Sequence, residues 1–280
     1  MSAIDQPMTV AGRTLALQQW HQSRSTKVLA LHGWLDNSAS FDFLAPLLPN
    51  SQIVAPDLAG HGLSDHRSAD AAYNIWQDVA EIHELGNQLG WDEFVLMGHS
   101  RGAIIASLFA ATFPEKITRL ILLDGLVPTP VNPEDAPRQL AQAITDSHLY
   151  RRKVPRFYDS REQALASRCR GELALSRKAA EAIASRGLAK NGEGYYWRAD
   201  QRLRGASEFK LTEDHCRAFV RAIACPTLLL IAGQEVNPYY QRLVALNEGI
   251  TTCCFDTSHH LHMEEACPVV AEKIRVFLRQ

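Results

Sequence analysis

The pentapeptide GHSRG, residues 98–102, has the G-x-S-x-G spacing that can present a serine as a nucleophile on a sharp turn. An apolar run over 93–97 precedes it and another over 103–113 follows, so Ser100 lies between a predicted strand and a predicted helix. Glycines on both sides let such a turn close, and a helix N-terminus directs backbone N–H groups toward a developing oxyanion. A serine that only caps a helix is the alternative, but the strand-turn-helix context favours a nucleophile.

A serine nucleophile requires a base, and three histidines, His259, His260 and His262, follow the last predicted strand. A histidine at this point emerges at the same carboxyl edge of a parallel sheet as a serine that follows a central strand. His259 is closest to the strand end and is the predicted base, with His260 as the alternative. The three histidines could instead form a metal-binding or pH-sensing cluster. Because no zinc-type spacing accompanies them, we predict no metal site.

The base needs a carboxylate that orients its tautomer, and two candidates follow predicted strands. Asp124 closes the apolar run 119–123, where an unpaired carboxylate would be costly to bury, so we expect it to have a partner. Glu235 lies in the loop after the run 227–232 and is the alternative acid. Asp124 could instead serve as a cap or turn residue. We favour Asp124 as the acid.

An oxyanion hole needs two donors, and the predicted ones are the backbone N–H groups of Trp34 and Arg101. Trp34 follows His32-Gly33 directly after a predicted strand, where esterases place such a loop, although its ring could simply be a packing aromatic. The Arg101 side chain has two interpretations: it pairs with an internal carboxylate such as Asp36, or it reaches the pocket and binds an acidic substrate group.

Short apolar runs that end at Gly, Pro or Asp alternate along the chain with helical patterns. Such runs are typical of strands buried on both faces of a parallel sheet, and the alternation predicts a doubly wound α/β fold. The predicted buried strands are 27–31, 52–55, 93–97, 119–123, 227–232 and 251–255, with an earlier, more exposed strand at 14–20. The predicted helices between and after them are 75–89, 103–113 and 269–278.

Region 126–222 interrupts this alternation, because it is rich in arginine, shows no strand run and is too long for a loop. Helical patterns over 138–150, 160–175 and 178–187 predict a helical insertion packed on one edge of the sheet. The expected division is therefore a core of 1–125 and 223–280 with a cap of 126–222.

Composition excludes several classes of protein. The 280 residues are 46% hydrophobic and 21% charged with a net charge of −2, values typical of a soluble globular protein. No polybasic block indicates nucleic-acid binding, and no run of about 18 apolar residues indicates a membrane span. The N-terminus lacks a signal-peptide pattern, and the six cysteines show no CxxC, so we expect reduced thiols and a cytoplasmic location.

Taken together, these segments resemble the α/β-hydrolase superfamily and, within it, the serine hydrolase-like subfamily. The segments that carry the resemblance are HGWLDN (32–37), FDFLAPLLP (41–49), PDLAGHGLSD (56–65), GHSRGA (98–103), LILLDG (120–125), RADQRLRG (198–205) and SHHLHMEE (258–265). The resemblance implies an eight-stranded, mostly parallel sheet flanked by helices, with a helical cap after the sixth strand. It also supports Asp124, because several related esterases place the acid there. The chain departs from the family in lacking an aspartate after the seventh strand and in having Arg101 after the nucleophile.

The predicted function is cleavage of a small carboxylic ester through a Ser100-His259-Asp124 triad and an acyl-enzyme intermediate, without a cofactor. A thioesterase, a carbon–carbon bond hydrolase or a perhydrolase could use the same triad. A ligand-binding protein with lapsed catalysis is less favoured, because every catalytic role has a candidate. The residues proposed to line the pocket, with packing inside the cap as the alternative, are His32, Trp76, Phe157, Tyr195, Tyr196 and Trp197.

Overall fold

The computed structural model describes residues 3–171 and 173–280, and within them eight strands form one sheet in the order β1-β2-β4-β3-β5-β6-β9-β10. All neighbours from β4 to β10 run parallel, whereas β2 is antiparallel to β1 and β4. The strands are β1 Ile4–Val10, β2 Arg13–Trp20, β3 Thr26–Leu31, β4 Ser51–Pro56, β5 Phe94–His99, β6 Ile117–Leu123, β9 Thr227–Ala232 and β10 Ile250–Phe255. This confirms the predicted α/β-hydrolase fold. The pattern missed β1, which is exposed along most of its length.

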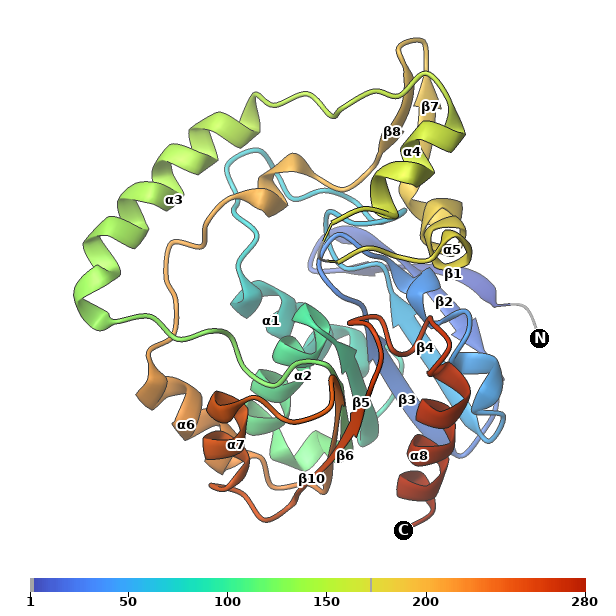
Figure 1. The fold of residues 1–280 in the computed structure, drawn as a ribbon, viewed down its shortest axis with the longest axis vertical. Helices are drawn as coiled ribbons and strands as arrows, with labels where there is room; N and C mark the ends of the chain where they lie inside the picture. Colours follow the sequence, from blue (N-terminus) through green and yellow to red (C-terminus); the bar gives the residue numbers. More distant parts are fainter. Residues whose placement is uncertain (1–2, 172) are drawn as a thin grey trace.

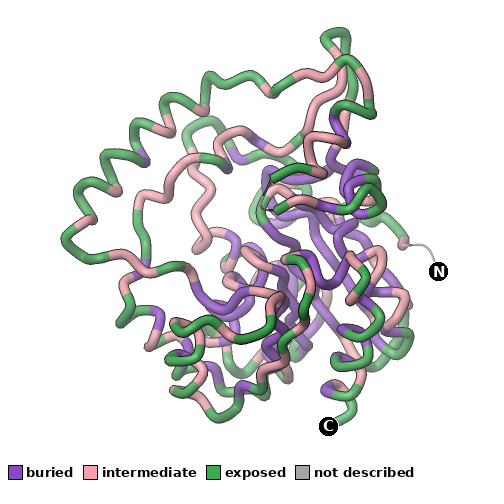
Figure 2. The backbone as a smooth tube through the Cα atoms, in the orientation of Figure 1, coloured by how far each residue is buried: buried purple, intermediate pink, exposed green. Residues whose placement is uncertain are grey.

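Helices cover both faces of the sheet, because alternate side chains of each buried strand point to opposite faces. On β3, Leu29 and Leu31 pack toward α1, α2 and α6, whereas Val28 and Ala30 pack toward α8. Figure 2 shows the buried residues concentrated in the sheet and in α2, which packs against it. The helices flanking the sheet are α1 Ile75–Gln88, α2 Arg101–Thr112, α6 Glu213–Ala222, α7 Pro238–Val244 and α8 Cys267–Arg279.

The segment 126–222 differs from its sequence prediction in two ways. It contains an antiparallel hairpin, β7 Leu188–Asn191 and β8 Gly194–Trp197, where no strand was expected. The sequences of these two strands, LAKN and GYYW, show no apolar–polar alternation. The helix predicted over 160–175 ends at Arg168. The remaining helices of this segment are α3 Ala136–Arg151, α4 Arg161–Arg168 and α5 Arg177–Gly187.

Packing divides this segment into parts. Figure 1 shows α4, α5 and the β7–β8 hairpin grouped at one end of the sheet, with α3 standing apart. α4 and α5 share a small apolar cluster that includes Leu165 and Ile183. Helix α6 instead packs on α2, and its Cys216 and Val220 belong to the core beneath the sheet. Part of the expected cap therefore packs with the sheet domain.

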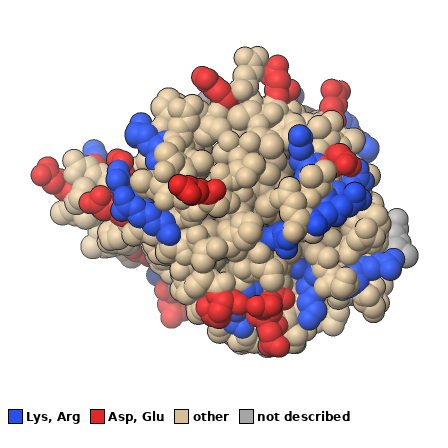
Figure 3. Space-filling model, turned by 90° about the horizontal axis from the view of Figure 1, so that it is seen from below, with Lys and Arg blue, Asp and Glu red and all other residues tan. Residues whose placement is uncertain are grey.

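The surface and the cysteines add two observations. On the face shown in Figure 3, acidic and basic side chains are interspersed, and neither kind covers the face. All six cysteines are free thiols. Among the residues described here, no helix combines the length and apolar character needed to cross a membrane.

Candidate active site

Ser100 occupies a strained turn between β5 and α2. Its backbone has φ +51° and ψ −115°, a region that residues with a side chain rarely adopt. The turn is held by hydrogen bonds from Ser100 N to Leu123 O (2.8 Å) and from Ile104 N to Ser100 O (3.1 Å). A Cβ on Gly98 would lie 2.3 Å from the carbonyl oxygen of Gly102, so only glycine allows the strand and helix to approach this closely.

Asp124 and His259, which are 135 residues apart in the sequence, meet beside this turn. The distance between Asp124 Oδ2 and His259 Nδ1 is 2.5 Å. The other carboxylate oxygen, Oδ1, accepts a hydrogen bond from Ala232 N at 3.0 Å. An imidazole that donates from Nδ1 to a carboxylate keeps Nε2 free to accept a proton. Both side chains are about one-fifth exposed, so they are reachable from solvent.

Ser100 and His259 line one cavity of about 380 Å³. The loop after β3 contributes Trp34 and Asp36 to the wall of this cavity, and the segment 126–222 contributes Tyr158 and Trp197 among others. A cavity of this size suits a small organic molecule.

The two predicted oxyanion residues are placed differently. Trp34 lies on the cavity wall with its residue 39% exposed, and its indole N–H donates to Leu203 O at 2.9 Å. Arg101 begins α2, next to Ser100. Its guanidinium turns away from this cavity and pairs with Asp78 Oδ2 at 2.5 Å. Arg101 thus pairs with an internal carboxylate as expected, but the partner is Asp78 and not Asp36.

Asp78 is the partner because a charged network is already buried there. Asp78 also pairs with Arg67 at 3.2 Å, and Arg67 in turn pairs with Glu81 at 2.8 Å, all with side chains no more than 5% exposed. Arg13 also pairs with Glu81. A buried carboxylate requires such compensation. The sequence reasoning could not anticipate this, because Asp78 lies on a helix whose apolar face was the visible signal.

Most of the residues expected to line the pocket lie elsewhere. His32 is fully buried, and its Nε2 accepts a hydrogen bond from Leu58 N at 2.9 Å. Trp76 lines a second cavity of about 310 Å³, together with Arg101. The remaining aromatics alternate along the β7–β8 hairpin and its neighbouring loop, so only part of them can face the cavity.

On that hairpin, Trp197 lines the cavity, whereas Tyr195 and Tyr196 do not, and neither does Phe157 in the loop between α3 and α4. The rings of Phe157 and Tyr196 pack edge to face with their centroids 5.6 Å apart. Tyr195 exchanges backbone hydrogen bonds with Tyr158. Packing within the segment, the alternative interpretation, therefore applies to these three residues.

Glu235, the alternative acid, is exposed on the loop after β9. Among the described residues, none forms a hydrogen bond or ion pair with its carboxylate. The structure therefore brings Asp124, and not Glu235, to His259.

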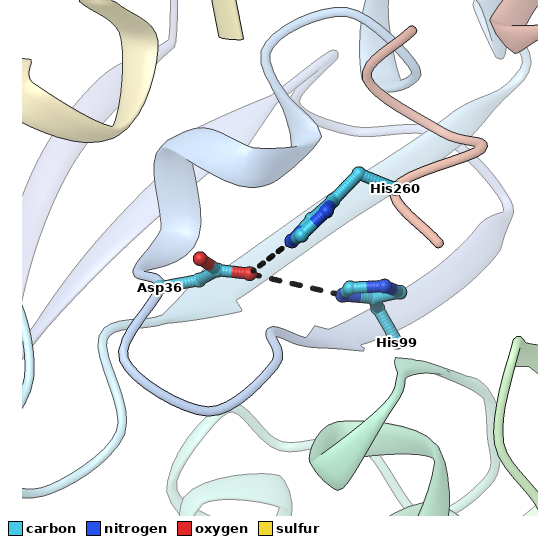
Figure 4. Close-up of side chains that lie close together, drawn as sticks. All are labelled: Asp36, His99 and His260. Atoms are coloured by element: carbon cyan, nitrogen blue, oxygen red, sulfur yellow. Dashed lines mark ion pairs between the residues drawn. The ribbon is translucent and has the colours of Figure 1, made fainter. Parts of the chain in front are cut away.

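Among the described residues, only His259 of the triplet pairs with Asp124, although His260 lines the same cavity. Figure 4 shows His260 and His99 facing Asp36, with Nε2 of His260 3.4 Å and Nδ1 of His99 3.8 Å from Asp36 Oδ2. His262 is buried against the ring of His99, with centroids 4.3 Å apart. His99 Nε2 contacts the backbone oxygen of His259 at 3.1 Å, so this cluster anchors the chain at His259.

Charge in this cluster is balanced by an arginine. Burial alone would raise the pKa of Asp36, but the hydrogen bond with His260 and the charge of Arg168, 2.5 Å away, hold that pKa well below its usual value. Burial, reinforced by its histidine neighbours, lowers the pKa of His99 and keeps this ring neutral. Asp36, His99 and His260 are of the types that ligate a divalent cation. Because Arg168 already neutralises Asp36, an anchoring role needs no cation.

Two functional features of the cavity escaped the sequence reasoning. Asp36 was considered only as a partner for Arg101. The segment 126–222 was recognised as rich in arginine, but no role was assigned to any of its arginines. Four of them line the cavity: Arg156, Arg168, Arg170 and Arg204.

Comparisons with known proteins show to which family the chain is similar. A family model described as alpha/beta hydrolase fold matches residues 27–238. The chain is 34% identical over 236 residues to serine hydrolase-like protein 2 of Homo sapiens, covering 78% of this chain and 71% of that protein. It is 32% identical over 274 residues to a serine hydrolase-like protein of Danio rerio, covering 91% and 82%.

Solved structures give the same result. A hypothetical protein of Pseudomonas aeruginosa PAO1 shares 37% identity with a TM-score of 0.93, and the match covers 100% of both chains. The thioesterase domain of a curacin biosynthetic pathway shares the fold, with a TM-score of 0.87 at 23% identity over 99% of this chain and 100% of that one. The chain therefore belongs to the α/β-hydrolase family and, within it, to the serine hydrolase-like proteins.

Proposed function

We propose that this hydrolase cleaves a small carboxylic ester by acyl transfer through Ser100, His259 and Asp124. The observation that carries the proposal is the 2.5 Å contact between Asp124 and His259 at a cavity that also contains a strained serine. Such strain persists where the surrounding structure enforces it, which is common at catalytic centres.

In the first step, His259 Nε2 accepts the proton of the Ser100 hydroxyl as its oxygen attacks the ester carbonyl. Asp124 holds the Nδ1 proton and stabilises the imidazolium that forms. The backbone N–H groups of Trp34 and Arg101 are proposed to bind the oxyanion, since Arg101 follows Ser100 directly and Trp34 lines the same cavity as Ser100. His259 then protonates the leaving alcohol, and a water repeats the sequence on the acyl-enzyme.

We also propose that the segment 126–222, apart from α6, acts as the cap of this site. Its support is that α4, the β7–β8 hairpin and the loops beside them supply one wall of the cavity.

Six free thiols fit a protein that works in a reducing compartment such as the cytoplasm.

A fluorophosphonate probe tests the proposal directly, because it labels only an activated serine. We expect labelling of the native chain and none of Ser100→Ala, with Ser107→Ala, a buried serine of α2, as the matched control. Labelling that survives in Ser100→Ala would refute the assignment.

A substrate panel then identifies the bond. Matched 4-nitrophenyl esters, acyl thioesters and carbon–carbon substrates present different leaving groups to the same triad. We expect the highest kcat/KM for esters. If kcat/KM for a thioester exceeded that for the matched ester by more than tenfold, the enzyme would be a thioesterase and the ester proposal would be wrong.

A further inference from the structure

We propose that the substrate carries an anionic group, a carboxylate or a phosphate, and that Arg204 with its neighbouring arginines binds this group inside the cavity. The inference rests on the proposed function, because it concerns the same cavity. It concerns binding, however, and can be tested without turnover.

The first support is the charge of the cavity wall. Four arginines line it, and among the residues that the structure describes only Asp36 contributes a carboxylate. That carboxylate is already paired with Arg168 and His260. Within the same described residues, neither Arg156 nor Arg204 forms an ion pair. Counted over the described residues, the cavity wall therefore carries more positive than negative charge, which a bound anion would balance.

The second support is that two of these guanidinium groups, although their residues are exposed, stack on aromatic rings. Arg204 lies over the ring of Trp34, with its Cζ 5.7 Å from the ring centroid. Arg156 lies over Tyr158 at 5.1 Å. All four of these residues line the cavity.

Stacking on an aromatic ring orients a guanidinium but leaves its N–H edge free to donate. A planar fork of donors held in this way matches the paired oxygens of a carboxylate or phosphate. Because less side-chain freedom is lost on binding, affinity rises for the same contacts. A third arginine, Arg168, lies over Trp197 in the same manner, at 6.0 Å.

The third support is the place of Arg204 in the cavity. Its stacking partner Trp34 follows Gly33 in the loop that borders the serine turn. A group bound by Arg204 therefore lies in the same cavity as Ser100, within reach of one small molecule. A cavity of about 380 Å³ holds such a molecule and not a folded macromolecule. The geometry thus favours an acidic small-molecule ester, such as the monoester of a dicarboxylic acid.

Binding to Ser100→Ala protein tests this proposal by titration calorimetry. The probes are monomethyl glutarate, methyl 4-phosphonobutanoate and the neutral dimethyl glutarate. One charge-assisted pair contributes enough to tighten the Kd about tenfold. We expect at least this preference for an anionic probe over the neutral one. Comparing the Kd values of the two anionic probes shows whether the site prefers a carboxylate or a phosphonate, which stands in for a phosphate.

The variant Arg204→Met, made in the same Ser100→Ala background, should reduce this preference to about twofold or less. Arg242→Met is the matched control, because Arg242 also stacks on an aromatic ring, Tyr239 at 5.8 Å, but outside the cavity. Arg156→Met serves as a second variant if Arg204→Met fails to fold.

Equal Kd values for charged and neutral probes, or a preference that survives in both cavity variants, would overturn the inference. Loss of the preference in Arg242→Met would also overturn it, because the effect would then come from overall charge. Since the Ser100→Ala protein cannot turn over an ester, these outcomes are independent of the probe-labelling test of Ser100.

Discussion

Replacing Asp124 by asparagine separates the chemistry of this carboxylate from its place in the fold. Asp124 has φ +50°, a left-handed conformation that asparagine tolerates well, so we expect Asp124→Asn to fold. Ala232 N donates to Oδ1 at 3.0 Å, which keeps the amide oxygen of asparagine at that position. The amide NH₂ group then faces His259 Nδ1, where Oδ2 lies in the native chain.

A donor at this position reverses the tautomer of the imidazole. His259 Nδ1 must accept from the amide, so the ring proton moves to Nε2, which can no longer take the proton of Ser100. Triad hydrolases lose about 10⁴-fold in kcat when the carboxylate becomes an amide, which corresponds to about 5 kcal/mol of transition-state stabilisation. We therefore expect kcat for the best ester of the panel to fall by about this factor.

Steady-state hydrolysis of a 4-nitrophenyl ester measures the effect, with the melting temperature as the check on folding. Glu235→Gln is the matched control, because Glu235 is the other candidate acid and its carboxylate is exposed. We expect kcat of this control within about twofold of the native value, as for most exposed substitutions. A folded Asp124→Asn variant within about tenfold of native kcat would refute the reasoning.

Three further predictions concern strain, charge and pH. Ser100→Gly should abolish hydrolysis and raise the melting temperature by about 2–4 °C, because glycine relieves about 1 kcal/mol of strain at φ +51°. Arg101→Met should lower the free energy of unfolding by about 2 kcal/mol in urea titrations, since Asp78 loses a buried partner. The ratio of charged to neutral ester turnover should stay within about twofold, and a larger change would show that Arg101 reaches the substrate. Burial raises the pKa of Asp42 to about 6 from 3.8, so the stability that its protonation contributes is complete below pH 3.8 and lost as pH rises through about 6. Asp42→Asn should therefore stabilise the chain at pH 8 by about 1 kcal/mol, after allowance for solvent screening, and have no effect near pH 3.5. An equal gain at both pH values would contradict this origin.

Short sequence patterns were sufficient to predict the elements whose formation depends on residues close together in the sequence. Buried parallel strands are short apolar runs, and five of them appear in the sequence where the structure has β3, β4, β5, β6 and β9. The sixth predicted run coincides with β10, but this strand lies at the edge of the sheet and is buried only at Ile250. The serine turn is visible for the same reason, because Gly98 is required sterically within one strand-turn-helix unit; Gly102 is required instead by the close approach of the backbone at Leu31, where β3 ends. The short hairpin β7–β8 left no such pattern and was missed.

The sequence left two candidates for the carboxylate that pairs with His259. Asp124 and Glu235 both follow strands that end at the same edge of the sheet, so topology alone brings each of them near His259. The structure separates them, because the Asp124 carboxylate is held between Ala232 N and His259 Nδ1, whereas Glu235 points to solvent.

The sequence by itself determined the fold class, the serine turn and the set of groups able to serve it, since each depends on residue type and short spacing. Only the tertiary structure decided the partner of Arg101 and which aromatics and arginines face the cavity. Those contacts join residues more than 20 positions apart, such as Arg101 with Asp78 and Arg204 with Trp34. The first contact depends on how α1 packs beside α2, and the second on how the segment 126–222 packs over the sheet. Side-chain direction in such packing is set by neighbours that a linear pattern does not contain.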